Sequence, residues 1–271
     1  MTKLDGALQP TDFDRTTAVV PIDGRPGEFA VELDVGWSSL VGVHGGYMCA
    51  IAVRGAEALV DDRSVRTLTT SFLRTGQVGS ATLSVHAVRE GRSFSTMVAD
   101  LVQDGRLLLT ARLTLMVDRE GVEWQTPSPI DLPDPEECTR MEGGRVVHFE
   151  RVDGVLDPRC LPFSGSDRAR IQGYVRPLEP RTVDAAWLAM VTDWFPPPAF
   201  LRIEPPTGGV SIDLTTHIHQ TRVSLDDGDW LTGAFEIETS SAGLATEHGR
   251  IARRDGTLVA ESFQTRLMTQ G

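Results

Sequence analysis

Alternating apolar and polar side chains indicate that most of this chain forms β-strands. The strands predicted for the first half are 29–35, 65–73, 81–88, 93–102 and 107–117, and those predicted for the second half are 147–152, 168–175, 210–219, 230–238, 244–252 and 257–267. Turns that contain Gly separate several of these runs. In both halves the last four runs follow a single helical segment, so the pattern predicts one helix and a long antiparallel meander per half.

The two predicted helices are both strongly apolar. The first begins at His44-Gly45-Gly46 and continues to about Val60. The second covers 183–194, with Thr182 as its N-cap and the three prolines 196–198 ending it. Apolar residues occupy most of its circumference, so this helix must be covered on most sides.

The second half of the chain repeats the first. Asp104-Gly105 precedes the last strand of one half and Asp255-Gly256 precedes the last strand of the other, 151 positions later (from 105 to 256). A long sheet with one apolar face can curl around an apolar helix and bury both. We therefore predict an α+β double hotdog fold with tandem units at 1–118 and 146–271, joined by a linker at 119–145 that is rich in Pro, Glu, Asp and Gly.

Composition excludes several classes of function. A net charge of −12 argues against nucleic acid or an anionic membrane as the main partner. The three cysteines form no CxxC pair, and we find no apolar run long enough for a signal peptide or a membrane span, so we expect a cytoplasmic protein without membrane insertion. Lys3 is the only lysine and asparagine is absent, which excludes lysine Schiff-base chemistry, GxxxxGK[ST] phosphate loops and catalytic sets that need Asn.

Asp193 is the main candidate for chemistry, because it lies at the edge of the apolar stripe of the second helix. A carboxylate there is costly unless hydrogen bonds or function hold it, and the alternative is a helix-end residue turned toward water. The first helix instead begins with His44, Gly45 and Gly46, whose free amides could bind an oxyanion, although the glycines could also serve close packing. If the helices pack antiparallel, the two ends form one composite site.

Four motifs resemble the type II acyl-CoA thioesterases, which are double-hotdog enzymes similar to bacterial TesB. They are the segments 71–74, 89–95, 211–213 with the downstream His219, and 258–264, and the resemblance covers nearly the whole chain. In that family an Asp on the second helix, a Thr or Ser on the next strand and a Gln on the last strand activate water. These positions correspond to Asp193, Ser211 and Gln264. Two departures are Ser211 in place of the commoner Thr and Gln220 in place of an expected Arg.

The resemblance implies a hydrolase that converts fatty acyl-CoA to a free fatty acid and CoA, without a metal or another cofactor. Asp193 would act as base, Ser211 and Gln264 would hold the water and the carboxylate, and the Gly46 amide would be the main oxyanion donor. Arg89, Arg92 and Ser93, at one turn, are candidates for contacts with CoA, whereas the alternative is ordinary solvated side chains. We also expect a homo-oligomer.

Two further functions remain open at this point. The first is a double-hotdog protein that binds acyl-CoA or another acyl ligand without catalysis. The second and weaker one is a hotdog hydratase, which is disfavoured because its usual motif needs an Asn. The sequence also predicts that Ser211, Asp213, His217 and His219 lie on one face of a strand. We expect no metal there, because no third ligand is evident.

Overall fold

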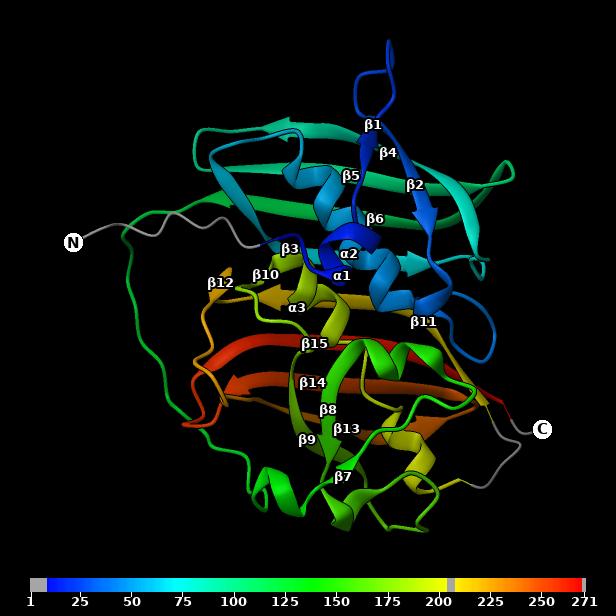
Figure 1. The fold of residues 1–271 in the computed structure, drawn as a ribbon, viewed down its shortest axis with the longest axis vertical. Helices are drawn as coiled ribbons and strands as arrows, with labels where there is room; N and C mark the ends of the chain where they lie inside the picture. The colour runs from blue at the N-terminus through cyan, green and yellow to red at the C-terminus, as the bar shows by residue number, and fades with distance from the viewer. Residues whose placement is uncertain (1–8, 204–207, 270–271) are drawn as a thin grey trace.

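A single antiparallel sheet of thirteen strands dominates the part of the chain that the computed structural model describes, residues 9–203 and 208–269. Lys3 and the outer ends of the two predicted units lie outside these residues. The strand order is β1-β2-β4-β5-β6-β3-β11-β15-β14-β13-β9-β8-β7. The order is nearly mirrored about the β3–β11 pair, so two meanders meet edge to edge and share one continuous sheet (Figure 1).

Between residues 9 and 118 the structure has two α-helices and six strands. They are α1 (Asp12–Thr16), β1 (Val20–Pro21), β2 (Glu28–Leu33), α2 (Gly45–Glu57), β3 (Arg63–Phe72), β4 (Gly79–Glu90), β5 (Phe94–Gln103) and β6 (Arg106–Val117). The second half contains β7 (Thr139–Arg140), β8 (Val152–Leu156), β9 (Ala169–Pro177), α3 (Ala185–Val191), β11 (Gly208–Ile218), β13 (Leu231–Ser241), β14 (Leu244–Arg253) and β15 (Leu258–Thr269). The short strands β10 (Val183–Asp184) and β12 (Arg222–Val223) pair separately.

Helices α2 and α3 lie between the two meanders and pack against each other antiparallel (Figure 1). At one end of the pair, Gly46 lies against the carbonyl oxygen of Met190, and at the other end Arg54 Nη1 lies 2.9 Å from Asp184 Oδ2. Every residue of α3 is buried, as its apolar circumference predicts. The antiparallel arrangement therefore brings the start of α2 to the end of α3.

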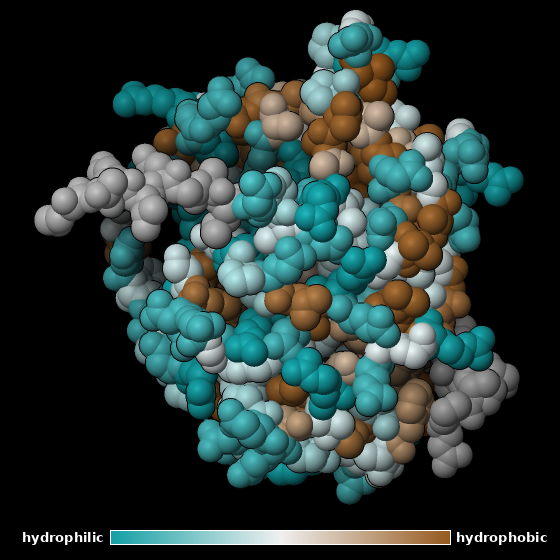
Figure 2. Space-filling model, viewed as in Figure 1, coloured by the Kyte–Doolittle hydropathy of each residue, from teal (hydrophilic) through white to brown (hydrophobic). Residues whose placement is uncertain are grey.

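Burial follows the predicted alternation. Every second side chain of β5 from Ser95 to Gln103 is buried, and the other side chains of this stretch are only partly buried. The largest fully buried side chains include Trp37, Trp187 and Trp194. The face drawn in Figure 2 is mostly polar with scattered apolar groups, which fits an apolar core beneath it.

Three predicted elements differ from the structure. Helix α3 starts after Asp184, whose side chain accepts a hydrogen bond from the Trp187 N–H (2.9 Å), so Asp184 and not Thr182 is the N-cap. Residues 147–151 form a 3-10 helix, and the strand begins only at Val152, where pairing with β9 starts. The segment 119–145 is irregular for most of its length but ends in a 3-10 turn and β7.

Candidate active site

Asp193 is not turned toward water. It follows the C-cap of α3, and its side chain is 7% exposed. Its Oδ2 accepts a hydrogen bond from the Gly46 N–H (2.8 Å), and its Oδ1 accepts one from Gln264 Nε2 (2.7 Å). One donor comes from each half of the chain, so the carboxylate lies at the junction of the two meanders and is fixed from both sides.

His44 caps α2 and holds the backbone of Asp193. Its Nδ1 accepts a hydrogen bond from the Tyr47 N–H (3.2 Å), so the ring proton lies on Nε2, which donates to the carbonyl oxygen of Asp193 (3.0 Å). Burial lowers the pKa of His44 although Asp193 opposes this shift. His148 stacks on its ring at 4.2 Å between centroids, and burial lowers the pKa of His148 to about 2. Both rings are therefore neutral at pH 7.

The two glycines behave differently from one another. The Gly46 amide holds the Asp193 carboxylate, so the prediction that it stands free for an oxyanion is corrected. The Gly45 N–H, at the first position of α2, has no acceptor within the described chain. Close packing also requires Gly46, because a Cβ there would lie 2.4 Å from the carbonyl oxygen of Met190. A Cβ on Gly45 would lie 2.9 Å from Asp193 Oδ2.

A β-bulge turns Ser211 toward Asp193. Ser211 pairs with Arg266 and Asp213 pairs with Thr265, so Ile212 is the extra residue in β11. The bulge shifts the alternation by one position, and Ser211 Oγ accepts a hydrogen bond from Gln264 Nε2 (2.6 Å). Asp213, beyond the bulge, faces the opposite side of the sheet. The prediction that Ser211 shares a face with Asp213, His217 and His219 is therefore wrong.

Two charged residues of this site are missing from the sequence-based candidates. Arg266 and Glu247 form a buried ion pair beneath Gln264, with 2.7 Å between Arg266 Nε and Glu247 Oε2. Their side chains are 5% and 2% exposed. Arg266 is two residues after Gln264 on β15, and so lies on the same face of the strand. That spacing was a usable signal for Arg266, but Glu247, on β14, has no comparable pattern.

The predicted CoA-contacting residues lie at the other end of α2. Arg63 lies a few residues after the C-terminus of α2. It donates a hydrogen bond to the carbonyl oxygen of Gly91 (3.0 Å) and so holds the turn after β4 near that end of the helix. A thirteen-residue helix is about 20 Å long, so Arg89, Arg92 and Ser93 do not meet Asp193. The Arg89 guanidinium lies over the Phe94 ring, at 4.3 Å from its centroid. Their contact with CoA stays a prediction.

An ion-pair cluster occupies the position that mirrors the site. Arg54 contacts Asp184 (2.9 Å) and Asp14 (3.0 Å), and Arg181 contacts Asp184 (2.6 Å) and Asp14 (2.8 Å). These residues join the end of α2 to the start of α3, where the mirror copy of the Gly46–Asp193 contact would lie. The two halves therefore form one buried carboxylate site and one structural ion-pair cluster.

None of the helices within residues 9–203 and 208–269 combines the length and the apolar character needed to cross a bilayer.

Comparison with known proteins connects this architecture to one family. The family model described as the acyl-CoA thioesterase N-terminal domain matches residues 33–116, and the one described as the acyl-CoA thioesterase C-terminal domain matches residues 128–268. Among solved structures, a conserved protein of unknown function with a hot dog fold from Alicyclobacillus acidocaldarius is similar, with a TM-score of 0.85 and 22% identity, over 96% of this chain and 98% of that chain.

Two mycobacterial structures are also similar. The tesB protein of Mycobacterium avium subs paratuberculosis has a TM-score of 0.78 and 20% identity, over 97% of this chain and all of that chain (100%). The acyl-CoA thioesterase II TesB2 of Mycobacterium marinum has a TM-score of 0.75 and 20% identity, over 96% of this chain and 98% of that chain. At these identities the solved structures establish the hot dog fold. Because the two family models cover most of its length, the chain belongs to the acyl-CoA thioesterase family.

Proposed function

We propose that this chain is a double-hotdog thioesterase that hydrolyses fatty acyl-CoA to a free fatty acid and CoA, with Asp193 as the group that activates water. The two units are 1–118 and 146–271, with 119–145 as the linker. The observation that carries the proposal is the Asp193 carboxylate, which is 7% exposed and is held by the Gly46 amide of one unit and by Gln264 of the other. Membership of the acyl-CoA thioesterase family supports the substrate class.

The carboxylate retains the capacity to act as a base. Each of its oxygens accepts one short hydrogen bond, and each has a further lone pair. A water molecule bound there passes a proton to Asp193 while its oxygen bonds to the thioester carbonyl carbon. The tetrahedral intermediate then collapses, the C–S bond breaks, and the CoA thiolate takes up the proton. Thiolate is a good leaving group, so this step needs no strong acid.

The Gly45 amide is the better candidate for the oxyanion donor. It lies at the positive end of α2, and its N–H has no acceptor within the described chain, whereas the Gly46 N–H is already bonded to Asp193. The carbonyl oxygen of the thioester would thus lie beside Gly45, with the water between the carbonyl carbon and Asp193.

Thiol release from short, medium and long acyl-CoA substrates tests the proposal. We expect Asp193→Ala to lower kcat by about 100-fold or more, as is typical for loss of a general base. Asp213→Ala is the matched control, since Asp213 lies two positions after Ser211 on β11 but on the opposite face of the sheet, and it should leave turnover unchanged. Enzyme without substrate corrects for Cys138, a partly buried free thiol that could react with the thiol reagent.

Two outcomes would contradict the proposal. Near-normal turnover by Asp193→Ala would place the chemistry elsewhere. Binding of acyl-CoA to the wild-type protein without any thiol release would instead favour a non-catalytic acyl-ligand binding protein.

We also propose a cellular compartment and an oligomeric state for the protein. Cys49, Cys138 and Cys160 are all free, which fits a reducing compartment such as the cytoplasm. A homo-oligomer of these chains is expected, and size-exclusion chromatography with light scattering would measure it.

A further inference from the structure

The buried pair Arg266–Glu247 lies directly behind the proposed catalytic residues. Arg266 Nε and Nη2 contact the two oxygens of Glu247 at 2.7 and 3.3 Å. The same guanidinium donates from Nη1 to Ser211 Oγ (3.2 Å) and from Nη2 to Gln264 Oε1 (2.7 Å). A planar group with five N–H donors in fixed directions can thus hold three neighbouring side chains at once.

Arg266 determines the orientation of the Gln264 side-chain amide. A guanidinium only donates hydrogen bonds, so the atom of Gln264 that faces it must be the amide oxygen. The amide nitrogen then faces the other way, and its two hydrogens go to Asp193 Oδ1 (2.7 Å) and Ser211 Oγ (2.6 Å). Gln264 therefore has no hydrogen left with which to hold a water molecule.

Ser211 receives two hydrogen bonds, one from Gln264 and one from Arg266. Neither of those groups can accept a hydrogen, so both lone pairs of the Ser211 oxygen are occupied and its own hydrogen must point to a third partner. No acceptor for that hydrogen lies among the described side chains of the site. The hydroxyl is therefore a donor directed into the site beside Asp193.

Glu247 restrains the guanidinium. Arg266 Nη2 lies 3.7 Å from Asp193 Oδ1, which is beyond a hydrogen bond. Without Glu247, the guanidinium of Arg266 could turn toward Asp193 and bind its carboxylate bidentately. That would occupy the lone pairs that a base needs. Glu247 is 2% exposed, and burial raises its pKa while Arg266 opposes the shift. The two hydrogen bonds that Glu247 accepts from Arg266 therefore hold the guanidinium in place.

We propose that Arg266, restrained by Glu247, is a positioning residue that sets the direction of the hydrogen bonds through Gln264 and Ser211. This makes the Ser211 hydroxyl the side-chain donor that holds the attacking water, while Gln264 only orients Asp193 and Ser211. The inference rests on the proposed thioesterase activity of the same site.

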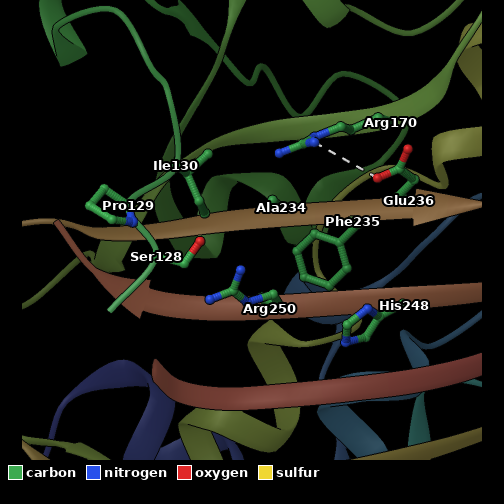
Figure 3. A pocket seen from close by; sticks show the side chains of 9 residues that line it. All are labelled: Ser128, Pro129, Ile130, Arg170, Ala234, Phe235, Glu236, His248 and Arg250. Atoms are coloured by element: carbon green, nitrogen blue, oxygen red, sulfur yellow. Dashed lines mark ion pairs between the residues drawn. The ribbon is translucent and has the colours of Figure 1, made fainter. Parts of the chain in front are cut away.

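The test compares two paired variants in the thiol-release assay. Arg266→Met with Glu247→Met removes both buried charges together, a change that usually leaves stability nearly unchanged, whereas removal of one partner does not. The control is Arg170→Met with Glu236→Met. This pair, at 3.8 Å, lines a surface pocket of about 260 Å³ together with Ser128, His248 and Arg250, as Figure 3 shows.

We expect the Arg266/Glu247 variant to fold and to lose about 100-fold in kcat, the size of effect expected for a misplaced reacting group, with KM little changed. The Arg170/Glu236 control should keep the wild-type kcat. Ser211→Ala should also lower kcat, and the triple variant should lose less than the product of the two separate losses, because both changes disturb the same hydrogen bond to water. If the paired variant does not fold, Arg266→Lys replaces it, since lysine keeps the positive charge but lacks the planar guanidinium with its several N–H donors.

The outcomes are distinguishable. An inactive wild-type protein would refute the proposed function and not this inference in particular. An active wild type with near-normal kcat in Ser211→Ala, or in a folded Arg266/Glu247 variant, would overturn the inference. So would losses that multiply in the triple variant, because they would show that Arg266 acts independently of Ser211.

Discussion

Replacing Gly46 by alanine should separate the two central helices and disable the site. The new Cβ would lie 2.4 Å from the carbonyl oxygen of Met190 and 2.9 Å from Asp193 Cβ, and neither atom can rotate away. Ordinary contact begins near 3.4 Å, so the helices must part by about 1 Å. The hydrogen bond from the Gly46 N–H to Asp193 Oδ2, now 2.8 Å, would then exceed hydrogen-bonding distance.

The expected magnitudes follow from that displacement. A shift of about 1 Å in a reacting group costs about 100-fold in rate, so kcat should fall by that order. Overpacking of this kind costs about 1–3 kcal/mol of the free energy of unfolding. For a protein of this size the melting temperature should fall by roughly 2–12 °C. Thiol release and thermal unfolding followed by circular dichroism measure the two effects.

Gly55→Ala is the matched control on the same helix. Its Cβ would also meet close neighbours, at 2.3 Å from Leu83 Cδ2 and 3.1 Å from Val85 Cγ2, but these are the ends of side chains and can move. It lies more than two turns from Gly46, so any loss of stability should leave kcat unchanged. The reasoning is refuted if Gly46→Ala keeps the wild-type kcat, or if Gly55→Ala loses as much activity at a temperature where both variants are folded.

Two further predictions concern pH. Burial would raise the pKa of Asp157, but hydrogen bonds from Arg159 and Gln172 hold it below the ordinary value of 3.8. Asp157→Asn should therefore lower the urea midpoint at pH 7, and the difference from wild type should shrink as the pH falls below 3.8 toward the lower pKa of the folded state. His148 has a pKa of about 2 in the folded state and 6.5 in the ordinary state, so the wild type should lose stability as pH falls below 6.5. His148→Phe should reduce that slope by up to about 1.4 kcal/mol per pH unit, measured as the free energy of unfolding, and an unchanged slope would contradict the assignment.

The sequence predicted the regular strands well because their alternation is long and one face of each is buried. The observed β5 (Phe94–Gln103) and β6 (Arg106–Val117) differ from the predicted runs by one residue at most. Asp104-Gly105 forms the predicted turn, with positive φ angles of 50° and 70°. The meeting of Gly46 with Asp193 was also predictable, because a duplicated unit with antiparallel helices brings a helix start beside a helix end.

Other features depend on contacts that no local pattern contains. The bulge at Ile212 arises where β11 pairs with β15, so simple alternation placed Ser211 on the wrong side. From the sequence alone Glu247 is an ordinary polar strand residue, because its burial depends on the ion pair with Arg266 on the next strand. The Gly46 amide was expected to be free because its acceptor, Asp193, is 147 residues away.

A duplicated unit could in principle form two equivalent sites, one at each end of the α2–α3 pair. Here the end that holds Gly46 and Asp193 has a carboxylate with few neighbours of opposite charge, since Arg266 remains 3.7 Å away and is paired with Glu247. At the other end, Asp184 lies within 3 Å of both Arg54 and Arg181. These close ion pairs, together with the hydrogen bond from the Trp187 N–H, occupy the lone pairs of Asp184 that a base needs, so Asp184 is not placed to activate water. The difference between the two ends therefore explains why one turnover site per chain is expected, and titration of the wild type with a tight-binding inhibitor should give a stoichiometry of one.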